Sequence, residues 1–310
     1  MLPNTWPELP LEAWKDTYAT LHMWTQIVGK VRLALSPRIN HWWEVPLYVN
    51  AVGLTTSPIP YRERVFEVQF NFLENVLSIS TCDGPQTVLP LRPQSVASFY
   101  SEFMGTLQSL GIDVKIWPMP VEIPNPIRFD RDTEHASYDP EFAQRFWLIL
   151  TRLDPVFKEF RSRFVGKHSP IHFFWGSFDL ASTRFSGRRS AERPGADPVT
   201  REAYSHEVIS AGFWPGGVDV PGAAFYVYAA PEPPGFKTAP VRPEKAFYSP
   251  LGEFLLMYDV VRLSANPENT LLDFLQSTYE AAANLGKWPR ADLERTPQQH
   301  AGNAGRTVRR

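Results

Sequence analysis

The sequence predicts an α+β protein made of two similar halves of roughly α-β-β-β-α order, with helices covering one face of one or two mainly antiparallel sheets. The first observation behind this is that segments of helical periodicity alternate with groups of short strand-like segments. The second is that short sequence landmarks recur in the same order in both halves. Together they predict an internal duplication, with an approximate two-fold axis relating the halves.

A long helix is predicted at the start of each half. Residues 11–31 carry apolar side chains at i, i+4 and i+7 spacing after Pro10, which predicts an amphipathic helix. A second helix is predicted from 140 to about 164, capped by Asp139 and kinked or divided at Pro155. The apolar stripe of each helix should face the core.

The same landmarks follow both long helices. Each helix closes on a Val-Gly-Lys segment whose glycine, Gly29 or Gly166, is typical of a helix C-terminus. Ser-Pro, histidine and two aromatic residues come next, and each half later contains an amphipathic segment ending in Leu-Gly. The paired segments are "IVGK" (27–30) and "FVGK" (164–167), "SPRINHWW" (36–43) and "SPIHFF" (169–174), and the helices predicted at 98–111 and 273–286.

Strand-like segments occupy the middle of each half. Two of them are predicted to form a hairpin around Glu74 and Asn75, and the glycine-rich segment 213–222 is predicted to connect another pair. The predicted strands are 45–52, 64–73, 76–82 and 112–117 in the first half, and 172–185, 204–213, 223–230 and 252–261 in the second.

Four regions follow from these patterns. The first repeat is predicted at 1–117 and the second at 140–288. Between them, 118–139 is rich in proline, which fixes φ and removes hydrogen-bond donors, so we expect an extended crossing strap. The polar segment 289–310 has no periodicity and is predicted to be a disordered tail.

Composition narrows the class of partner. The net charge is -2, from 31 basic and 33 acidic residues, so neither nucleic acid nor a membrane surface is expected as a partner. A single cysteine, Cys82, rules out an internal disulfide and a zinc site that needs two or more cysteines. With no signal peptide or membrane-spanning segment evident, we expect a cytoplasmic protein with a small-molecule partner.

Several long motifs carry a family resemblance. They include "HWW", "PLYV", "TTSPIPY", "HASYDPE", "REAYSHEVISAGFWPGG" and "AFYSPLGEFLL". In these the chain resembles an uncharacterised family of bacterial proteins of similar length, classed as a domain of unknown function. The resemblance covers nearly the whole chain and implies no activity.

The segment 169–189 contains the densest group of unusual side chains. If 171–184 is one central strand, alternation places Trp175, Ser177 and Asp179 on one face, and we expect the main pocket between that face and the helices. Arg184, Arg188 or Arg189 would be the charged partner of Asp179. The repeat predicts a matching strand at 41–51, with His41 in the place of His172 and Glu44 on the mixed face with Trp42 and Tyr48.

These faces predict a site for general acid–base chemistry on a small polar or anionic metabolite. Glu44 and Asp179 would exchange protons, and Tyr48 and His172 would orient them or the substrate. The expected ligand-binding side chains are Trp42, Trp175, Ser177, Arg184 and Arg188, of which Arg184 would hold an anionic group.

Two other functions remain open. The aromatic faces could hold a ligand or partner chain without catalysis. Alternatively, a metal-dependent enzyme could use His41, His135, His172 and His206 with nearby carboxylates, although no ligand spacing supports such a site and no metal ligands are assigned. The sequence identifies no cofactor and leaves the oligomeric state undetermined.

Overall fold

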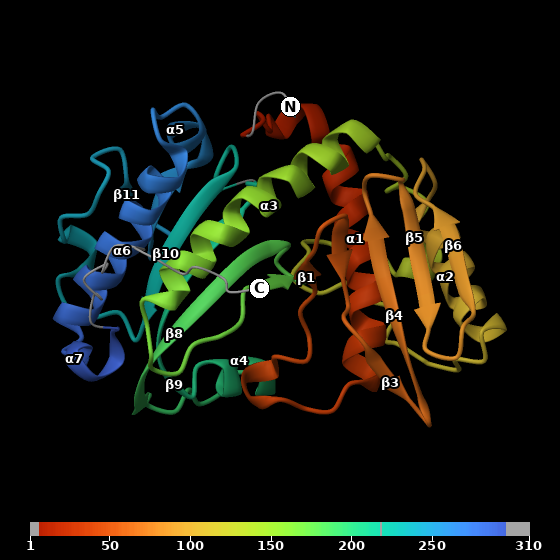
Figure 1. The fold of residues 1–310 in the computed structure, drawn as a ribbon, viewed down its shortest axis with the longest axis horizontal. Coiled ribbons are helices and arrows are strands. Elements are labelled where there is room, and N and C mark those ends of the chain that lie inside the picture. Colours follow the sequence, from red (N-terminus) through yellow and green to blue (C-terminus); the bar gives the residue numbers. More distant parts are fainter. Residues whose placement is uncertain (1–5, 218, 296–310) are drawn as a thin grey trace, which may run out of the picture.

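The computed structural model describes residues 6–217 and 219–295. This part of the chain is a mixed α/β protein with seven α-helices and two antiparallel sheets (Figure 1). None of the helices in the described ranges is long and apolar enough to cross a membrane.

Side-chain caps define where the longer helices begin. Asp139 accepts hydrogen bonds from the first turn of α3, as predicted, while Ser95 caps α2 and Asn266 caps α6. The helix α1 begins after Pro10, also as predicted. The helices are α1 (Leu11–Leu35), α2 (Val96–Ser109), α3 (Pro140–Ser162), α4 (Pro198–Ala203), α5 (Tyr258–Arg262), α6 (Pro267–Leu285) and α7 (Arg290–Leu293).

The first sheet has the order β1-β2-β4-β5-β6, with β3 pairing with β4. The hairpin predicted around Glu74 and Asn75 is confirmed, because β4 and β5 pair on either side of this turn. Alternate residues of β4 are buried, and α1 and α2 lie on the covered side (Figure 1). Its strands are β1 (Tyr48–Val49), β2 (Gly53–Thr55), β3 (Ile59–Tyr61), β4 (Arg64–Asn71), β5 (Val76–Thr81) and β6 (Gln86–Pro90).

The second sheet has the order β11-β12-β10-β9-β8-β7. The helices α3 and α6 pack on each other and contact β8, β9 and β10, so they cover one face of this sheet (Figure 1). The predicted connection 213–222 does join β9 to β10. Its strands are β7 (His172–Phe174), β8 (Asp179–Arg189), β9 (His206–Trp214), β10 (Ala224–Ala230), β11 (Phe247–Ser249) and β12 (Glu253–Met257).

The two sheets meet where β1 approaches β7. The backbone of Leu47 exchanges two hydrogen bonds with that of Phe173, of 2.8 and 2.9 Å, in an antiparallel bridge. Both side chains are fully buried. Figure 1 shows α1 standing beside this junction, between the two sheets. The halves therefore share one core.

The prediction of a single strand over 171–184 is wrong. The strand β7 ends at Phe174, a turn follows, and β8 begins at Asp179. Phe178 closes the turn with a φ of 58°, a left-handed conformation that a strand does not allow. Its buried ring packs on Tyr18 and His22 of α1, and this packing stabilises the turn. The alternation of faces predicted from His172 onward therefore holds only from Asp179.

The matching strand predicted at 41–51 is also wrong. Residues Asn40–Trp42 form a short 3-10 helix, and both His41 and Trp42 have positive φ. Only Tyr48 and Val49 form a strand, β1. The proposed equivalence of His41 with His172 on two related strands therefore has no structural basis.

Three smaller predictions also differ from the structure. Gly29 does not end the first helix, which continues to Leu35. The glycine instead makes room for the Trp175 indole, which lies on the helix backbone at this point. Pro155 does not divide α3, whose buried face holds the helix together on both sides of it. Residues 112–117 form no strand.

The strap and the tail have some structure of their own. The predicted strap, 118–139, contains no strand and is irregular: it bends at several positions, Glu122 and Asn125 have positive φ, and Phe129–Arg131 form a 3-10 turn. Of the segment predicted as a disordered tail, 289–295 contains α7 and a bridge from Glu294 to Phe164. The remainder, 296–310, lies outside the described residues.

A glycine pair tests the contact between α1 and Trp175. A Cβ atom at Gly29 would overlap the Trp175 indole, so Gly29→Ala should lower the free energy of unfolding by about 1–3 kcal/mol through overpacking. Gly105 lies in α2 with no atom within 4 Å of its would-be Cβ, so Gly105→Ala should raise it by about 0.5–1 kcal/mol. Urea unfolding of both variants measures the difference. Equal stabilisation by both substitutions would contradict the close packing.

Candidate functional site

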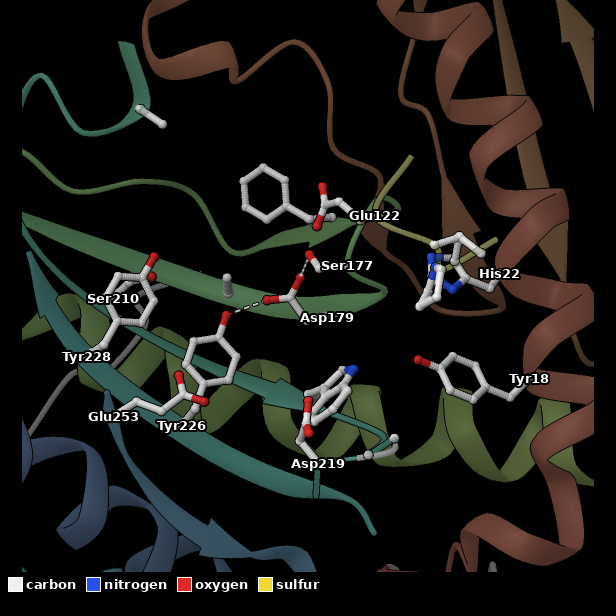
Figure 2. A pocket seen from close by; sticks show the side chains of 18 of the residues that line it. Tyr18, His22, Glu122, Ser177, Asp179, Ser210, Asp219, Tyr226, Tyr228 and Glu253 are labelled. Carbon is white, nitrogen blue, oxygen red and sulfur yellow. Dashed lines mark hydrogen bonds between the residues drawn. The ribbon is translucent and has the colours of Figure 1, made fainter. Parts of the chain in front are cut away.

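A cavity of about 1070 Å³ lies on the face of the second sheet that α3 and α6 do not cover. Its floor comes from β8, β9, β10 and β12, and its walls come from the N-terminal half of α1, the strap and the loop before β10 (Figure 2). The volume is sufficient for a metabolite. Segments far apart in the sequence thus line a single cavity.

Strand alternation sets the floor of this cavity. On β8 every second residue from Asp179 faces it, through Ala181 and Thr183 to Phe185. On β10 the same alternation presents Tyr226 and Tyr228, whose rings stack with centroids 6.1 Å apart. The floor is therefore polar at Asp179 and aromatic around it.

Asp179 is the polar centre of the cavity. Its carboxylate accepts hydrogen bonds from the hydroxyls of Ser177 and Tyr226 (Figure 2), and the residue is 6% exposed. Burial raises the pKa of the Asp179 carboxyl. Among the described residues Asp179 forms no ion pair, so its charge is balanced only by neutral donors.

A glycine makes the Tyr226 contact possible. Tyr226 lies on β10 opposite Gly212 on β9, and Gly212 lies opposite Ala181 on β8. A Cβ atom at Gly212 would overlap the Tyr226 phenol. Because Gly212 has no side chain, the phenol crosses β9 and reaches Asp179 on the next strand.

Two more carboxyl groups face the same space. Burial raises the pKa of Glu253 to about 7, and the charge of Asp179 makes a smaller contribution in the same direction. The same two causes raise the pKa of Glu122, on the strap. Figure 2 shows Glu122 and Glu253 on opposite sides of Asp179. At neutral pH Glu253 is therefore present in both its protonated and its ionised form.

The wall contributed by α1 carries Tyr18 and His22. The two rings stack one turn apart, with centroids separated by 5.9 Å. The Nε2 atom of His22 lies 2.8 Å from the Gly176 carbonyl oxygen, and burial lowers the pKa of His22 to about 4. A neutral His22 therefore donates to this carbonyl and adds no positive charge to the cavity.

The arginines predicted to neutralise Asp179 lie elsewhere, and this prediction is wrong. Arg184 is buried on the opposite face of β8, where its guanidinium lies 3.5 Å from the Phe160 ring centre and donates to the Phe160 carbonyl. Arg188 forms an ion pair of 2.6 Å with Glu207. Alternation explains Arg184, because even-numbered residues of β8 face α3.

Three of the predicted catalytic residues, Glu44, Tyr48 and His172, are not among those that line the cavity. They lie near the junction of β1 and β7, where the Tyr48 and His172 rings are 5.6 Å apart. One carboxylate oxygen of Glu44 accepts the Ile39 backbone N–H at 3.0 Å. Burial, with a smaller contribution from Arg32, lowers the pKa of His172 to about 3.

The predicted ligand-binding aromatics also have structural contacts. Trp175 packs on α1 and donates its indole N–H to the Val45 carbonyl at 2.7 Å. The Arg38 guanidinium lies over the Trp42 ring, 4.0 Å from the centre of that ring. Of the predicted site residues, Asp179 and Ser177 line the cavity and the others do not.

Sequence reasoning missed Glu122, Glu253, Tyr18 and Tyr226. One signal was present: Tyr226 and Tyr228 alternate in a predicted strand, which places two phenols on one face. Glu122 and Glu253 had no such signal, because a lone glutamate beside a strap or strand usually faces solvent.

In the part of the chain that the structure describes, the histidines form no metal-binding cluster, although His135 pairs with the Asp132 carboxylate at 2.7 Å. No group of three or more His, Cys, Asp or Glu side chains there could hold a metal ion. His41 lines the cavity, but its Nε2 atom lies 2.6 Å from the Lys167 Nζ and its Nδ1 atom 3.0 Å from the Glu202 carbonyl oxygen. The histidine alternative gains no geometric support.

The fold and cavity define a mixed α/β protein with two joined antiparallel sheets and an acidic, aromatic cavity on one of them. Residues 6–295 match the model of a family of unknown function, DUF5996, and the chain belongs to this family. The resemblance to a domain of unknown function is thereby confirmed. No curated protein and no solved structure matches the chain.

The raised pKa of Glu253 predicts a pH-dependent stability. Folding raises this pKa from 4.5 to about 7, so the folded state prefers the protonated carboxyl, and stability is lost as the pH rises through that interval. Glu253→Gln should therefore match the parent protein near about pH 5 and exceed it in Tm near about pH 8. Thermal unfolding across this range measures the difference.

The matched control is Glu63→Gln, at an exposed position in the β3–β4 turn. Its Tm difference from the parent protein should be small and independent of pH. A difference for Glu253→Gln that is also constant with pH would show that Glu253 is ionised normally.

Proposed function

We infer that the cavity binds a small molecule and that Asp179 and Glu253 perform general acid–base chemistry on it. One observation carries the proposal: carboxyl groups from the strap, β8 and β12 line the same cavity, which is large enough for a metabolite. Buried carboxyl groups without cationic partners are unfavourable for stability, and such arrangements are typical of functional sites.

The protonation states support this chemistry. A carboxyl with a pKa near neutral pH is present in both forms, so it can donate or accept a proton with little free-energy cost. Glu253 has such a pKa, at about 7. Asp179 is held by Ser177 and Tyr226, and these contacts fix the direction in which its free lone pairs point. Glu253 would transfer the proton, and Asp179 would orient the ligand.

The chemical class of metabolite differs from the sequence-based expectation. The sequence predicts a small polar or anionic metabolite, and the anionic option depends on Arg184, which does not line the cavity, whereas the lining is acidic. Binding without catalysis is the second candidate, and the aromatic rings around Asp179 support it. Both candidates place the ligand in the same cavity, so one set of variants tests both.

Two further proposals concern the origin and location of the chain. Each half has a long helix, then six strands, then a second long helix, and this shared order supports an internal duplication with the Leu47–Phe173 bridge near the proposed two-fold axis. The second half differs by two short additional helices, α4 between β8 and β9 and α5 before α6. The single cysteine, Cys82, is exposed and unpaired, which supports a reducing cytoplasmic location. Separate expression of 1–117 and 140–295 would test whether the halves fold alone or only together.

A thermal-shift screen with amines, carboxylates, sugars and nucleosides tests the binding proposal. At least one class should raise the Tm of the parent protein, because a ligand that binds only the folded state stabilises it. Asp179→Asn should remove this shift while leaving the fold intact. Asp273→Asn, on the exposed side of α6, is the matched control and should retain it. Equal shifts for both variants would place the ligand outside the cavity.

Turnover is tested on the compounds that bind. Mass spectrometry should detect conversion by the parent protein and a large loss of conversion by Glu253→Gln, with binding preserved. Conversion at an unchanged rate in Glu253→Gln would contradict the acid–base role. Binding with no conversion by either protein would favour the non-catalytic candidate.

A further inference from the structure

We propose that the ligand of this cavity is an organic cation, a primary or quaternary amine on a small apolar body. The inference rests on the proposed binding function and adds the chemical class of the ligand. It depends on three features of the cavity: an unbalanced negative lining, aromatic rings around the buried carboxylate, and a volume far above that of a bare ion.

The charge of the lining is one-sided. Lys15 is the only lysine or arginine among the described lining residues, and its ammonium pairs at 2.7 Å with Glu12 at the rim. The histidine facing Asp179 across the cavity, His22, is neutral because its pKa is lowered to about 4. The acidic lining residues are Glu12, Glu122, Asp179, Asp219 and Glu253. A cationic ligand is therefore the complement of this surface.

Asp179 is the counter-ion that the structure offers. It is more than nine-tenths buried and faces the cavity, and the side chains that bond to it within the described residues are the neutral hydroxyls of Ser177 and Tyr226. Two hydroxyl donors leave lone pairs of the carboxylate free. A primary ammonium group at this point would donate a charge-assisted hydrogen bond to the carboxylate in a region of low dielectric, where such bonds are strong. A quaternary ammonium group has no N–H to donate and would gain the Coulomb attraction alone.

The aromatic lining favours an organic cation over a metal ion. Tyr18, Trp214, Tyr226 and Tyr228 all line the space around Asp179, and Figure 2 shows Tyr18 and Tyr226 on opposite sides of this carboxylate. Ring faces attract ammonium groups and pack against their carbon atoms, whereas a bare divalent cation needs oxygen or nitrogen ligands. No cluster of such ligands occurs among the described residues.

Binding of a cation should be coupled to proton release. The pKa of Glu253 is about 7 because the group is buried and faces Asp179. A positive charge placed between these acids favours their ionised forms and lowers this pKa. Near neutral pH the complex would therefore release protons, whereas a neutral ligand would release none.

Calorimetry with isosteric probes tests the proposal. Benzylamine, benzyl alcohol and benzoate share a ring and differ in charge, and choline and 3,3-dimethylbutanol form a second matched pair. We expect benzylamine, choline or both to bind at least about tenfold more tightly than the neutral or anionic probe of the same set. Titrations at neutral pH in phosphate and in HEPES, neither of which is a primary or quaternary amine, should differ in heat by an amount that reports proton release, and Glu253→Gln should reduce this difference.

Variants locate the interaction. Asp179→Asn should weaken amine binding by about tenfold or more, and Glu122→Gln is a second test if that variant folds poorly. Asp273→Asn should bind as the parent protein does. Tighter binding of benzyl alcohol or benzoate, with sensitivity to Asp179→Asn, would overturn the cationic class and leave the proposed function standing. If no amine binds, the cationic class of ligand is also overturned. If, in addition, no compound in the thermal-shift screen binds, the proposed binding function itself is refuted.

Discussion

The packing of the β7–β8 turn against α1 is the contact on which the rest of the molecule depends. The Trp175 indole lies on the helix where Gly29 has no side chain, and His22 bonds to the Gly176 carbonyl in the same turn. These contacts join the first helix of the chain to the first hairpin of its second half. Because the turn ends at Asp179, the same packing also fixes the position of the carboxylate in the cavity.

The electrostatics of the cavity follow from that placement. The turn brings Ser177 to Asp179, and Gly212 allows Tyr226 to reach it across β9. Both partners are neutral, so the desolvation of the carboxylate is only partly offset. Glu253 is also buried and lies near the charge of Asp179, and these two causes together raise the pKa of Glu253. In the proposed function, the unfavourable free energy of these acids in the isolated protein would be the source of affinity for a compensating ligand.

Local patterns in the sequence were sufficient for much of the fold. Helical periodicity and the cap at Asp139 located α1 and α3, and the turn at Glu74 and Asn75 located a hairpin, because each depends on residues close in the chain. The continuous aromatic pattern at 171–184 did not distinguish a strand from a hairpin. Packing of the Phe178 ring on α1, on Phe146 of α3 and on Phe173 stabilises the positive φ in the turn between β7 and β8.

The residues of the cavity were also only partly predictable from local sequence. A carboxylate within an aromatic segment was enough to indicate Asp179, and Ser177 lies two residues before it. Nothing local separated Glu122 and Glu253 from solvated glutamates, because burial and the charge of Asp179 are what distinguish them. Those two influences come from segments that are distant in the sequence. The sequence by itself thus determined the four long helices, most of the strands and one carboxylate of the cavity. Only tertiary packing decided which side chains surround that carboxylate, since proximity across a fold leaves no local pattern.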